Sequence, residues 1–180
     1  AWVSEVTRHV IIGNGPAGVV AAETLRRADA AAEITLIGDE AEPPYSRMAI
    51  PYLLMGKIDE AGTYLRKDAD HFERLRIRML LGRVAAINSG ARTLRLADGG
   101  ILPYDRLLIA SGAQPVRPPV PGIDLPKVLS CWTLADARAI VAGIGRGVRV
   151  LQMGAGFIGC IIMESLAARG PQLTVVEMGD

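Results

Sequence analysis

The sequence predicts an α/β protein built around two strand–helix–strand units. In each unit an apolar segment runs into the pattern G-x-G-x-x-G, a helix-length segment follows, and a second apolar segment ends at an acidic residue. The glycines lie at residues 13–18 in the first unit and at residues 154–159 in the second. One such pattern is weak, because glycines also serve turns that bind nothing, but two complete copies make chance a poor explanation.

The first unit begins with an apolar strand over residues 7–12, which leads into Gly13, Gly15 and Gly18. The first glycine permits a tight turn, the second lets backbone amides approach a pyrophosphate, and the third lets the helix pack closely on its strand. The second strand ends at Asp39, which lies 21 residues past Gly18. This is near the spacing of about 20 that is expected for a carboxylate that binds an adenosine ribose.

The helix of the first unit is expected to turn Val19, Val20 and Leu25 toward the sheet. Glu23 should then face water. A proline-rich loop over residues 40–52 follows, and prolines suit a segment that crosses a ligand without regular hydrogen bonding. A surface linker is the alternative interpretation of this loop.

The middle of the chain predicts two short helices and a run of strands. The helices are expected over residues 51–56 and 68–75, with Asp68 as the N-cap of the second. Apolar spacing and glycine-containing turns predict an antiparallel meander with strands over residues 77–81, 84–88, 93–96 and 101–103.

Residues 104–113 are expected to form a buried strand that ends in small side chains, where another backbone or a cofactor can come close. Five of the eleven prolines lie between residues 115 and 126, which indicates a stiff crossover. This change in composition predicts a domain boundary near residue 118. Thr133 is then expected to cap a helix over residues 136–142.

The second unit repeats the organisation of the first. An apolar strand over residues 148–153 enters Gly154, Gly156 and Gly159, and a helix follows. The next apolar strand ends at Glu177, which lies 18 residues past Gly159. The second unit is therefore expected to hold a dinucleotide in the same way as the first.

Composition excludes several classes of protein. The chain has 180 residues, of which 50% are hydrophobic, enough for one large domain or two small ones. A net charge of +1 argues against a dedicated binder of nucleic acid or acidic membranes. No apolar run reaches the length of a membrane span and no signal pattern precedes the first strand, so cytoplasmic residence is the default expectation.

Few side chains have the spacing of a catalytic or metal site. Cys131 and Cys160 are too few and too isolated for a disulfide framework or a metal site. His9 falls in the first strand and His71 in a polar helix, and neither has partners at ligand or triad spacing. We expect no catalytic side chain and no metal ligand, and a structural role for both histidines.

Four stretches, at residues 13–18, 44–47, 107–115 and 154–159, occur in a characteristic order and spacing. In this order the chain resembles the N-terminal part of the FAD-dependent pyridine nucleotide-disulfide oxidoreductase superfamily, in the branch of ferredoxin, rubredoxin and nitrite reductases. The resemblance covers nearly the whole chain. The third stretch is the most specific, because it resembles the superfamily's strand that reaches the FAD from the second side.

The resemblance implies a Rossmann-like FAD-binding domain with a three-layer ββα arrangement and an antiparallel meander over residues 1–118. Residues 119–180 would hold the crossover and the first βαβ unit of an incomplete, Rossmann-like NAD(P)H-binding domain. The residues implied for FAD are Gly13, Gly15, Pro16, Ala17, Gly18, Asp39, Arg47, Val84, Ala110, Ser111 and Gly112. Those implied for the nicotinamide cofactor are Gly154, Gly156, Phe157, Ile158, Gly159 and Glu177.

The implied function is a flavoprotein oxidoreductase that passes hydride from NADH to FAD and electrons on to a redox partner. A carboxylate at Glu177 would repel a 2′-phosphate, so NADH is favoured over NADPH. The partner would be a ferredoxin, a rubredoxin or a prosthetic group such as a nitrite reductase centre, and the full-length protein would form a homodimer. The alternatives are an NADH oxidase or peroxidase, and a flavin- or NADH-responsive interaction protein without turnover.

Three features depart from the superfamily pattern. Trp132 stands where an arginine commonly precedes Thr-Leu-x-Asp-Ala, and it would either stack near the cofactor or fill a core position. Residues 51–52 stand where relatives often place a lysine. No redox cysteine is expected beside the flavin, so electrons should leave the flavin directly. The chain also stops soon after Glu177, so we expect a fragment that is inactive alone.

Overall fold

The computed structural model describes residues 6–179, which fall into two compact units. The first comprises the described residues up to Tyr45 together with Tyr64–Ala113. The second comprises Ser46–Thr63 and the described residues from Gln114 onward. The loop after the first strand–helix–strand unit thus belongs by its contacts to the second unit, and the boundary expected near residue 118 stays a prediction about domains.

A parallel sheet of four strands forms the centre of the first unit. Its order is β3-β2-β1-β7, and the strands are β1 (Arg8–Ile12), β2 (Glu33–Gly38), β3 (Ile77–Leu81) and β7 (Arg106–Ile109). In the register of the sheet, Ile11 lies opposite Leu36 on one side and Leu108 on the other. The carboxyl ends of these strands, which lead into residues 13, 39 and 110, therefore meet at one edge of the sheet.

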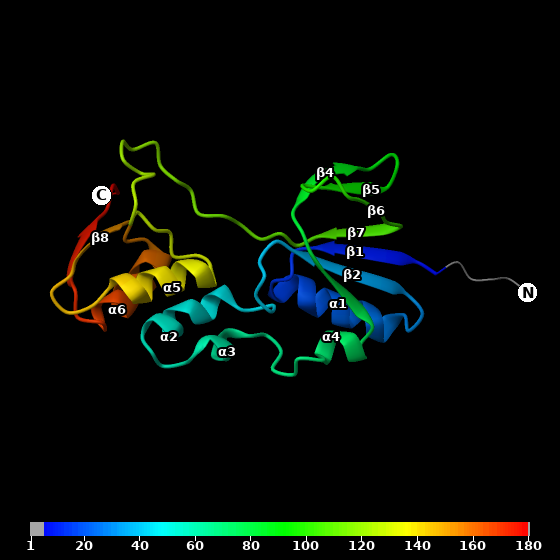
Figure 1. Cartoon of the computed structure of the whole chain (residues 1–180), viewed down its shortest axis with the longest axis horizontal. Coiled ribbons are helices and arrows are strands. Elements are labelled where there is room, and N and C mark those ends of the chain that lie inside the picture. The colour runs from blue at the N-terminus through cyan, green and yellow to red at the C-terminus, as the bar shows by residue number, and fades with distance from the viewer. Residues whose placement is uncertain (1–5, 180) are drawn as a thin grey trace, which may run out of the picture. The chain divides into compact units, whose positions relative to one another are not determined.

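Two layers cover the sheet of the first unit. Figure 1 shows helix α1 (Pro16–Ala28) along one face and an antiparallel meander over the other. Alternation along β1 explains this, because Ile11 packs with Val19 of α1 whereas Val10 packs with Leu94 of the meander. The predicted three-layer arrangement is confirmed.

The meander consists of β4 (Val84–Asn88), β5 (Thr93–Leu96) and β6 (Ile101–Pro103), which pair in sequence order. The prediction that residues 77–81 begin this meander is wrong. They form β3, which pairs in parallel with β2. Strand periodicity reports which face is buried but not which strand is the partner, and so could not separate the two sheets.

Two expectations about burial in the first unit are also wrong. Glu23 is only 8% exposed whereas Val20 is 53% exposed. The buried face of α1 therefore includes Glu23 and leaves out Val20, contrary to expectation. Glu23 is tolerated there because Arg66 and His71 bind its carboxylate. In β7, Leu108 and Ile109 are exposed rather than buried, because β7 is the edge strand of the sheet that the structure describes.

The short helix of the first unit, α4 (His71–Arg74), is shorter than the segment expected over residues 68–75. Its N-cap is Asp70 rather than Asp68, without a capping bond from the Asp70 side chain. Asp68 instead pairs with Arg74 at 3.0 Å. The prediction of a helix was thus right, and its boundary and cap were wrong.

The second unit contains three helices that pack together and a two-stranded sheet. Helix α2 (Ile50–Leu54) contacts both α5 (Leu134–Gly143) and α6 (Phe157–Ala167), as Figure 1 shows. The strands β8 (Arg149–Met153) and β9 (Gln172–Val176) pair in parallel. A 3-10 turn, η1 (Arg47–Ala49), precedes α2, and the four-residue helix α3 (Glu60–Thr63) completes this set.

Helix α5 has the N-cap that the sequence predicts, Thr133, but it begins at Leu134 rather than at residue 136. The Thr133 hydroxyl accepts from the Asp136 nitrogen at 3.1 Å, and the Asp136 carboxylate accepts from the Thr133 nitrogen at 2.9 Å. This reciprocal arrangement is a capping box, which satisfies two backbone donors at the helix start. Leu134, Ala137 and Ile140 form the buried face of the helix.

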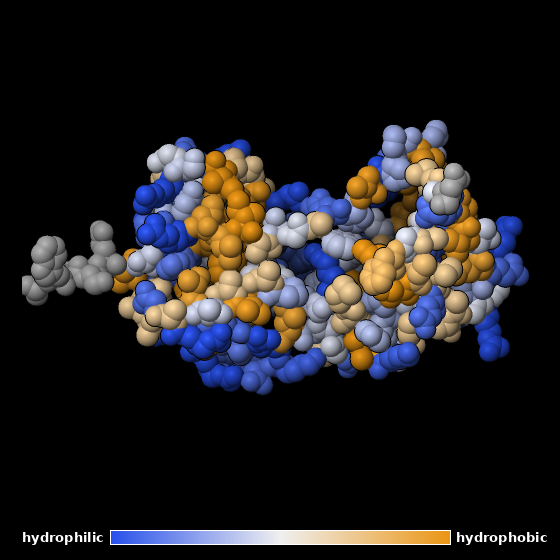
Figure 2. Space-filling view, turned by 180° about the vertical axis from the view of Figure 1, so that it is seen from behind, coloured by the Kyte–Doolittle hydropathy of each residue, from blue (hydrophilic) through white to orange (hydrophobic). Residues whose placement is uncertain are grey.

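Apolar side chains remain on the surface of both units, as the orange areas in Figure 2 show. In the second unit Leu151 and Met153 of β8 are 62% and 52% exposed, and Phe157 of α6 is 81% exposed. The apolar pattern therefore predicted the strand conformation of β8 but not its burial. Among the described residues, no helix is both long and apolar enough to cross a membrane.

Candidate functional site

The first glycine turn lies at the carboxyl end of β1. Gly13 has φ +106°, which an L side chain rarely adopts, and its nitrogen donates to the carbonyl of Ile37 at 2.8 Å. A Cβ at Gly13 would come within 2.2 Å of the Ala110 carbonyl oxygen. Glycine is therefore required at residue 13, because the backbone of the neighbouring strand closes on it.

Gly18 and Gly15 have opposite surroundings. A Cβ at Gly18 would lie 1.9 Å from the carbonyl oxygen of Gly13, so this glycine lets α1 pack tightly against the turn. At Gly15, by contrast, a Cβ would meet nothing within 4 Å. Gly15 is the N-cap of α1 and Pro16 occupies its first turn. The open side of the turn thus faces solvent at the positive end of a helix, where an anion is favoured.

The loop after β7 also reaches the first turn. The Ala110 nitrogen donates to the Ile12 carbonyl at 2.7 Å, and the Ser111 nitrogen would be 2.9 Å from a Cβ on Gly13. Gly112 follows with φ +69°. The structure therefore brings the predicted residues 110 and 111 beside the first glycine of the motif.

The end of β2 lies beside the same turn. A Cβ at Gly38 would meet the Asn14 side chain at 2.4 Å, so a glycine here leaves room for Asn14. The next residue, Asp39, has a half-exposed carboxylate that lies 3.2 Å from Arg83. Arg83 directly precedes Val84, the first residue of β4. Sequence reasoning missed Arg83, because this residue lies 44 positions from Asp39 along the chain.

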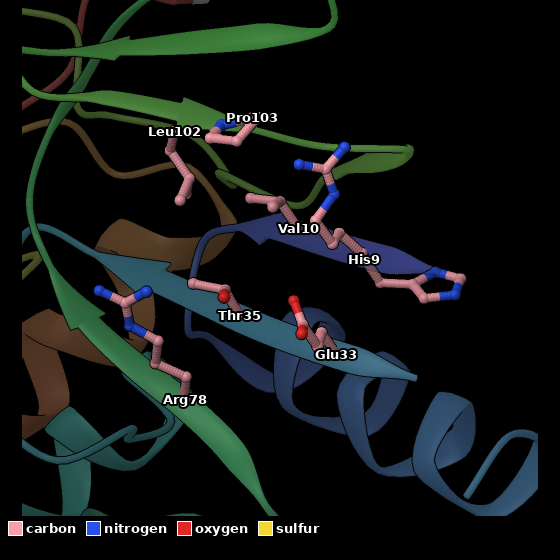
Figure 3. A pocket seen from close by; sticks show the side chains of 8 residues that line it. His9, Val10, Glu33, Thr35, Arg78, Leu102 and Pro103 are labelled. Atoms are coloured by element: carbon pink, nitrogen blue, oxygen red, sulfur yellow. The ribbon is translucent and has the colours of Figure 1, made fainter. Parts of the chain in front are cut away.

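Two pockets among the described residues of the first unit differ in position. One, of about 430 Å³, lies at the carboxyl ends of the strands, where parallel sheets usually bind ligands. Its lining includes Asn14, Gly38, Glu40 and Leu81. The other, of about 240 Å³, lies toward the opposite ends of β1 and β2. Figure 3 shows the side chains that line it, among them His9, which places this histidine away from the glycine turn.

The second glycine turn repeats the first in detail. Gly154 has φ +99°, and its nitrogen donates to the Val176 carbonyl at 2.8 Å. A Cβ at Gly159 would lie 2.4 Å from the Gly154 carbonyl oxygen, whereas one at Gly156 would meet nothing within 4 Å. Gly156 is the N-cap of α6. The second turn thus has the same open side as the first.

Glu177 reaches the second turn directly. Its carboxylate accepts from the Ala155 nitrogen at 2.5 Å, and from the nitrogens of Met178 and Gly179 at 2.7 and 3.1 Å. These bonds, the one from Ala155 above all, lower the pKa of Glu177 below its usual value. The predicted acid therefore lies at its glycine turn and is ionised at neutral pH. Phe157 and Ile158, also predicted, lie exposed at the start of α6.

Gln152 is a residue of this turn that sequence reasoning missed. Its amide nitrogen donates to the carbonyls of Gly154 and Gly159, both at 2.8 Å. The signal was available, because a glutamine stands between apolar residues two positions before the first glycine.

Arg47 and Trp132 contact each other within the second unit. The Arg47 guanidinium donates to the Trp132 carbonyl at 2.7 Å and lies 5.2 Å from the centroid of its ring, within range of a cation–π interaction. The indole nitrogen of Trp132 is buried and has no hydrogen-bond partner among the described residues. Trp132 thus packs with Arg47, and the roles of both residues toward a cofactor stay predictions.

The described histidines and cysteines have ordinary surroundings. His71 lies 2.8 Å from the Glu23 carboxylate, in keeping with the structural role expected for it. Burial raises the pKa of the Cys131 thiol to about 11, whereas Cys160 is exposed and its thiol lies 3.1 Å from the Ala155 carbonyl. Within residues 6–179, no group of histidine, cysteine and acidic side chains has the arrangement of a metal site.

Comparison with known proteins gives consistent matches. Residues 7–180 match the family described as pyridine nucleotide-disulphide oxidoreductase. The chain is 34% identical over 177 residues to the NADH-dependent phenylglyoxylate dehydrogenase subunit epsilon of Aromatoleum evansii, covering 98% of this chain and 42% of that protein. It is 40% identical over 171 residues to the ferredoxin–NAD(+) reductase component of the anthranilate 1,2-dioxygenase system of Burkholderia cepacia, covering 93% and 42%.

A solved structure agrees with these matches. The crystal structure of a ferredoxin reductase from Rhodopseudomonas palustris superposes with a TM-score of 0.89 and 31% identity, covering 96% of this chain and 43% of that one. The chain thus spans less than half the length of these relatives.

Proposed function

Because the chain belongs to the pyridine nucleotide-disulphide oxidoreductase family, we propose that it is part of an FAD-dependent enzyme that takes hydride from NADH and passes electrons to a redox partner. The observation that carries this proposal is the duplicated glycine turn. Each unit has a positive-φ glycine directly after its first strand, an open N-cap glycine and a helix packed against the turn. Two such turns suit two dinucleotides.

We assign FAD to the first turn. The pyrophosphate would lie on the open side of Gly15, against Pro16, Ala17 and the helix start, where a Cβ is absent and the helix dipole favours negative charge. Asp39 would bind the adenosine ribose. The predicted contacts from Val84 and from the loop after β7 belong to this assignment, as does Arg47.

We assign NADH to the second turn. Gly156, Phe157 and Ile158 would cover its pyrophosphate at the start of α6, and Glu177 would accept hydrogen bonds from its adenosine ribose. The hydrogen bonds that lower the pKa of Glu177 keep it ionised, so a 2′-phosphate would meet a negative charge. This supports NADH rather than NADPH as the electron donor.

In this proposal the flavin supplies the redox chemistry, because it accepts a hydride and releases electrons. The residues of the chain bind and orient the two dinucleotides through backbone amides, helix ends and the two acids. No side chain among those described is assigned as a general acid or base. The residue ranges 1–118 and 119–180 would then correspond to the FAD domain and to the start of the NADH domain.

The electron acceptor would be a small electron-transfer protein or a further prosthetic group. The names of two similar proteins, both ferredoxin reductases, support a ferredoxin as the acceptor. We further propose that the whole protein forms a homodimer, as the family resemblance implies. We also propose that it acts in the cytoplasm, where NADH is available as electron donor.

Rapid mixing of the full-length protein with NADH tests the proposal. The flavin absorbance band should bleach when NADH is mixed in. A ferredoxin added afterwards should restore the band faster than dissolved oxygen does. An unchanged flavin spectrum would refute the proposal. Restoration by oxygen alone would instead favour an NADH oxidase, and slow restoration by every acceptor would favour a protein without turnover.

A further inference from the structure

In both glycine turns the first glycine donates a backbone hydrogen bond to the neighbouring strand, and in the second turn a side chain binds as well. Gln152 donates both hydrogens of its amide, one to the Gly154 carbonyl and one to the Gly159 carbonyl, at 2.8 Å each. These carbonyls belong to the first and last glycines of the motif. A single side chain therefore fixes both ends of the turn.

The first unit shows that the fold does not require this glutamine. Ile11 stands at the corresponding position, two residues before the first glycine, and is fully buried against α1. There the turn is enclosed by the strand next to it, because the Ala110 carbonyl lies 2.2 Å from a Cβ built on Gly13. A Cβ built on Gly154 meets nothing within 4 Å in the described chain. Within the described residues, the Gln152 side chain contacts the second turn, whereas a backbone segment closes on the first.

The amide oxygen of Gln152 indicates that this residue does more than stabilise the fold. Its Oε1 is buried and has no hydrogen-bond partner among the described residues. Burying an unpaired carbonyl destabilises a fold, and an apolar side chain of similar volume would avoid this. Exchange of the amide oxygen and nitrogen would not help, since an oxygen would then face two carbonyl oxygens.

We propose that Gln152 is a positioning residue for NADH. By holding the carbonyls of Gly154 and Gly159 on the inner side, it keeps them from facing a pyrophosphate and leaves the amides of the turn outward. This inference rests on the proposed function, because it assumes that the second turn binds the dinucleotide. The expected signature is weaker NADH binding without a loss of stability.

The test is Gln152→Ile in the full-length protein. This substitution gives the second unit the side chain that Ile11 has at the corresponding position of the first. The dissociation constant of NADH, measured from the concentration dependence of flavin reduction, should rise about tenfold, because two hydrogen bonds that order the turn are lost. The limiting rate of flavin reduction should change by less than about twofold, since the bound geometry is the same. The thermal midpoint should change little, because removal of the buried, unpaired Oε1 offsets the two lost hydrogen bonds. Gln152→Met, which keeps the length of the side chain, should behave in the same way.

Gln172→Ile is the matched control, because it makes the same change at an exposed position on β9 of the same sheet. It should leave NADH binding unchanged. Unchanged NADH binding in both Gln152 variants, with normal binding by the unmodified protein, would overturn the inference but not the proposed function. Weaker binding with a matching fall in thermal midpoint would also overturn it, because Gln152 would then be merely structural. Failure of the unmodified protein to bind NADH would refute both.

Discussion

The carboxylate of Glu177 accepts a hydrogen bond from the backbone nitrogen of Ala155, so the acid after β9 reaches the glycine turn after β8. In the first unit the larger side chain lies in the turn instead. Asn14 occupies the position of Ala155, and Gly38 occupies the position of Glu177. The first unit thus carries its acid one residue later, at Asp39. The two turns share a backbone but differ in the acid that each offers to a ribose.

Replacing Glu177 should change the choice of nicotinamide cofactor. In Glu177→Gln the negative charge that would oppose a 2′-phosphate is lost, along with an acceptor for the ribose hydroxyls. We expect the preference for NADH over NADPH to fall by about tenfold, mostly through weaker NADH binding. The measurement is the concentration dependence of flavin reduction with each cofactor.

Glu164→Gln controls for the loss of one negative charge, because Glu164 is exposed on α6 of the same unit. It should leave the preference unchanged. If Glu177→Gln retained the full preference for NADH, the assignment of Glu177 to the ribose would be wrong.

The two glycines of the first turn should respond differently to an added methyl group. Gly15→Ala should leave the free protein stable, because φ is −73° and nothing lies within 4 Å of the new Cβ, but it should weaken FAD binding by about tenfold or more. Gly18→Ala should destabilise the fold by about 2 kcal/mol or more, because its Cβ would lie 1.9 Å from the Gly13 carbonyl oxygen. Urea unfolding and FAD titration of each variant measure the two effects.

Gly62→Ala is a useful control for FAD binding, because Gly62 lies in α3 of the second unit and its new Cβ would lie 2.7 Å from the Cβ of Ile58. It should not affect FAD binding. If Gly15→Ala bound FAD as well as the unmodified protein does, then the open side of this turn would not be where the pyrophosphate lies.

The parts of the fold that sequence predicted are those that local chemistry determines. Gly13 and Gly154 adopt positive φ because their own turns require it, and Thr133 caps α5 through a residue three positions away. Such features depend on a few neighbouring residues. The family resemblance added the order of the segments, which local patterns do not give.

The parts that sequence missed depend on distant partners. Glu23 is buried because Arg66, which lies 43 residues away in the chain, binds its carboxylate. Strand β3 belongs to the parallel sheet because it pairs with β2. Arg83 lies near Asp39 only after β2 and β3 have paired. Gln152 was the exception, since its contacts are local and its polarity between apolar neighbours was visible.

The two thiols should differ in reactivity. Because burial raises the pKa of Cys131 to about 11, only about one thiol in a thousand is ionised at pH 8. Cys160 is exposed. Cys131 is partly buried, so we expect iodoacetamide to modify Cys160 first and Cys131 much more slowly in the native protein, which peptide mass spectrometry would show. Equal labelling of the two cysteines in the native protein would contradict the burial of Cys131.

The carboxylate of Glu23 lies inside the first unit between Arg66 and His71. Arg66 donates to both of its oxygens, at 2.7 and 2.6 Å, and His71 lies at 2.8 Å. The bonds from Arg66 lower the pKa of Glu23 below that of an exposed glutamate. Its stabilising contribution is therefore fully present above the pKa of the unfolded chain, about 4.3, and is lost as the pH falls through the folded value.

Comparison with Glu23→Gln isolates this contribution. At pH 7 the unmodified protein should be more stable than the variant by about 2 kcal/mol, after allowance for the partial exposure of Arg66. The difference should shrink as the pH falls below about 4. Arg8 also lowers the pKa of Asp105, but that pair is common to both proteins and cancels. Urea unfolding from pH 7 to pH 3 provides the measurement, with the exposed Glu73→Gln as the control. A difference that is independent of pH would show that Glu23 acts through packing rather than charge.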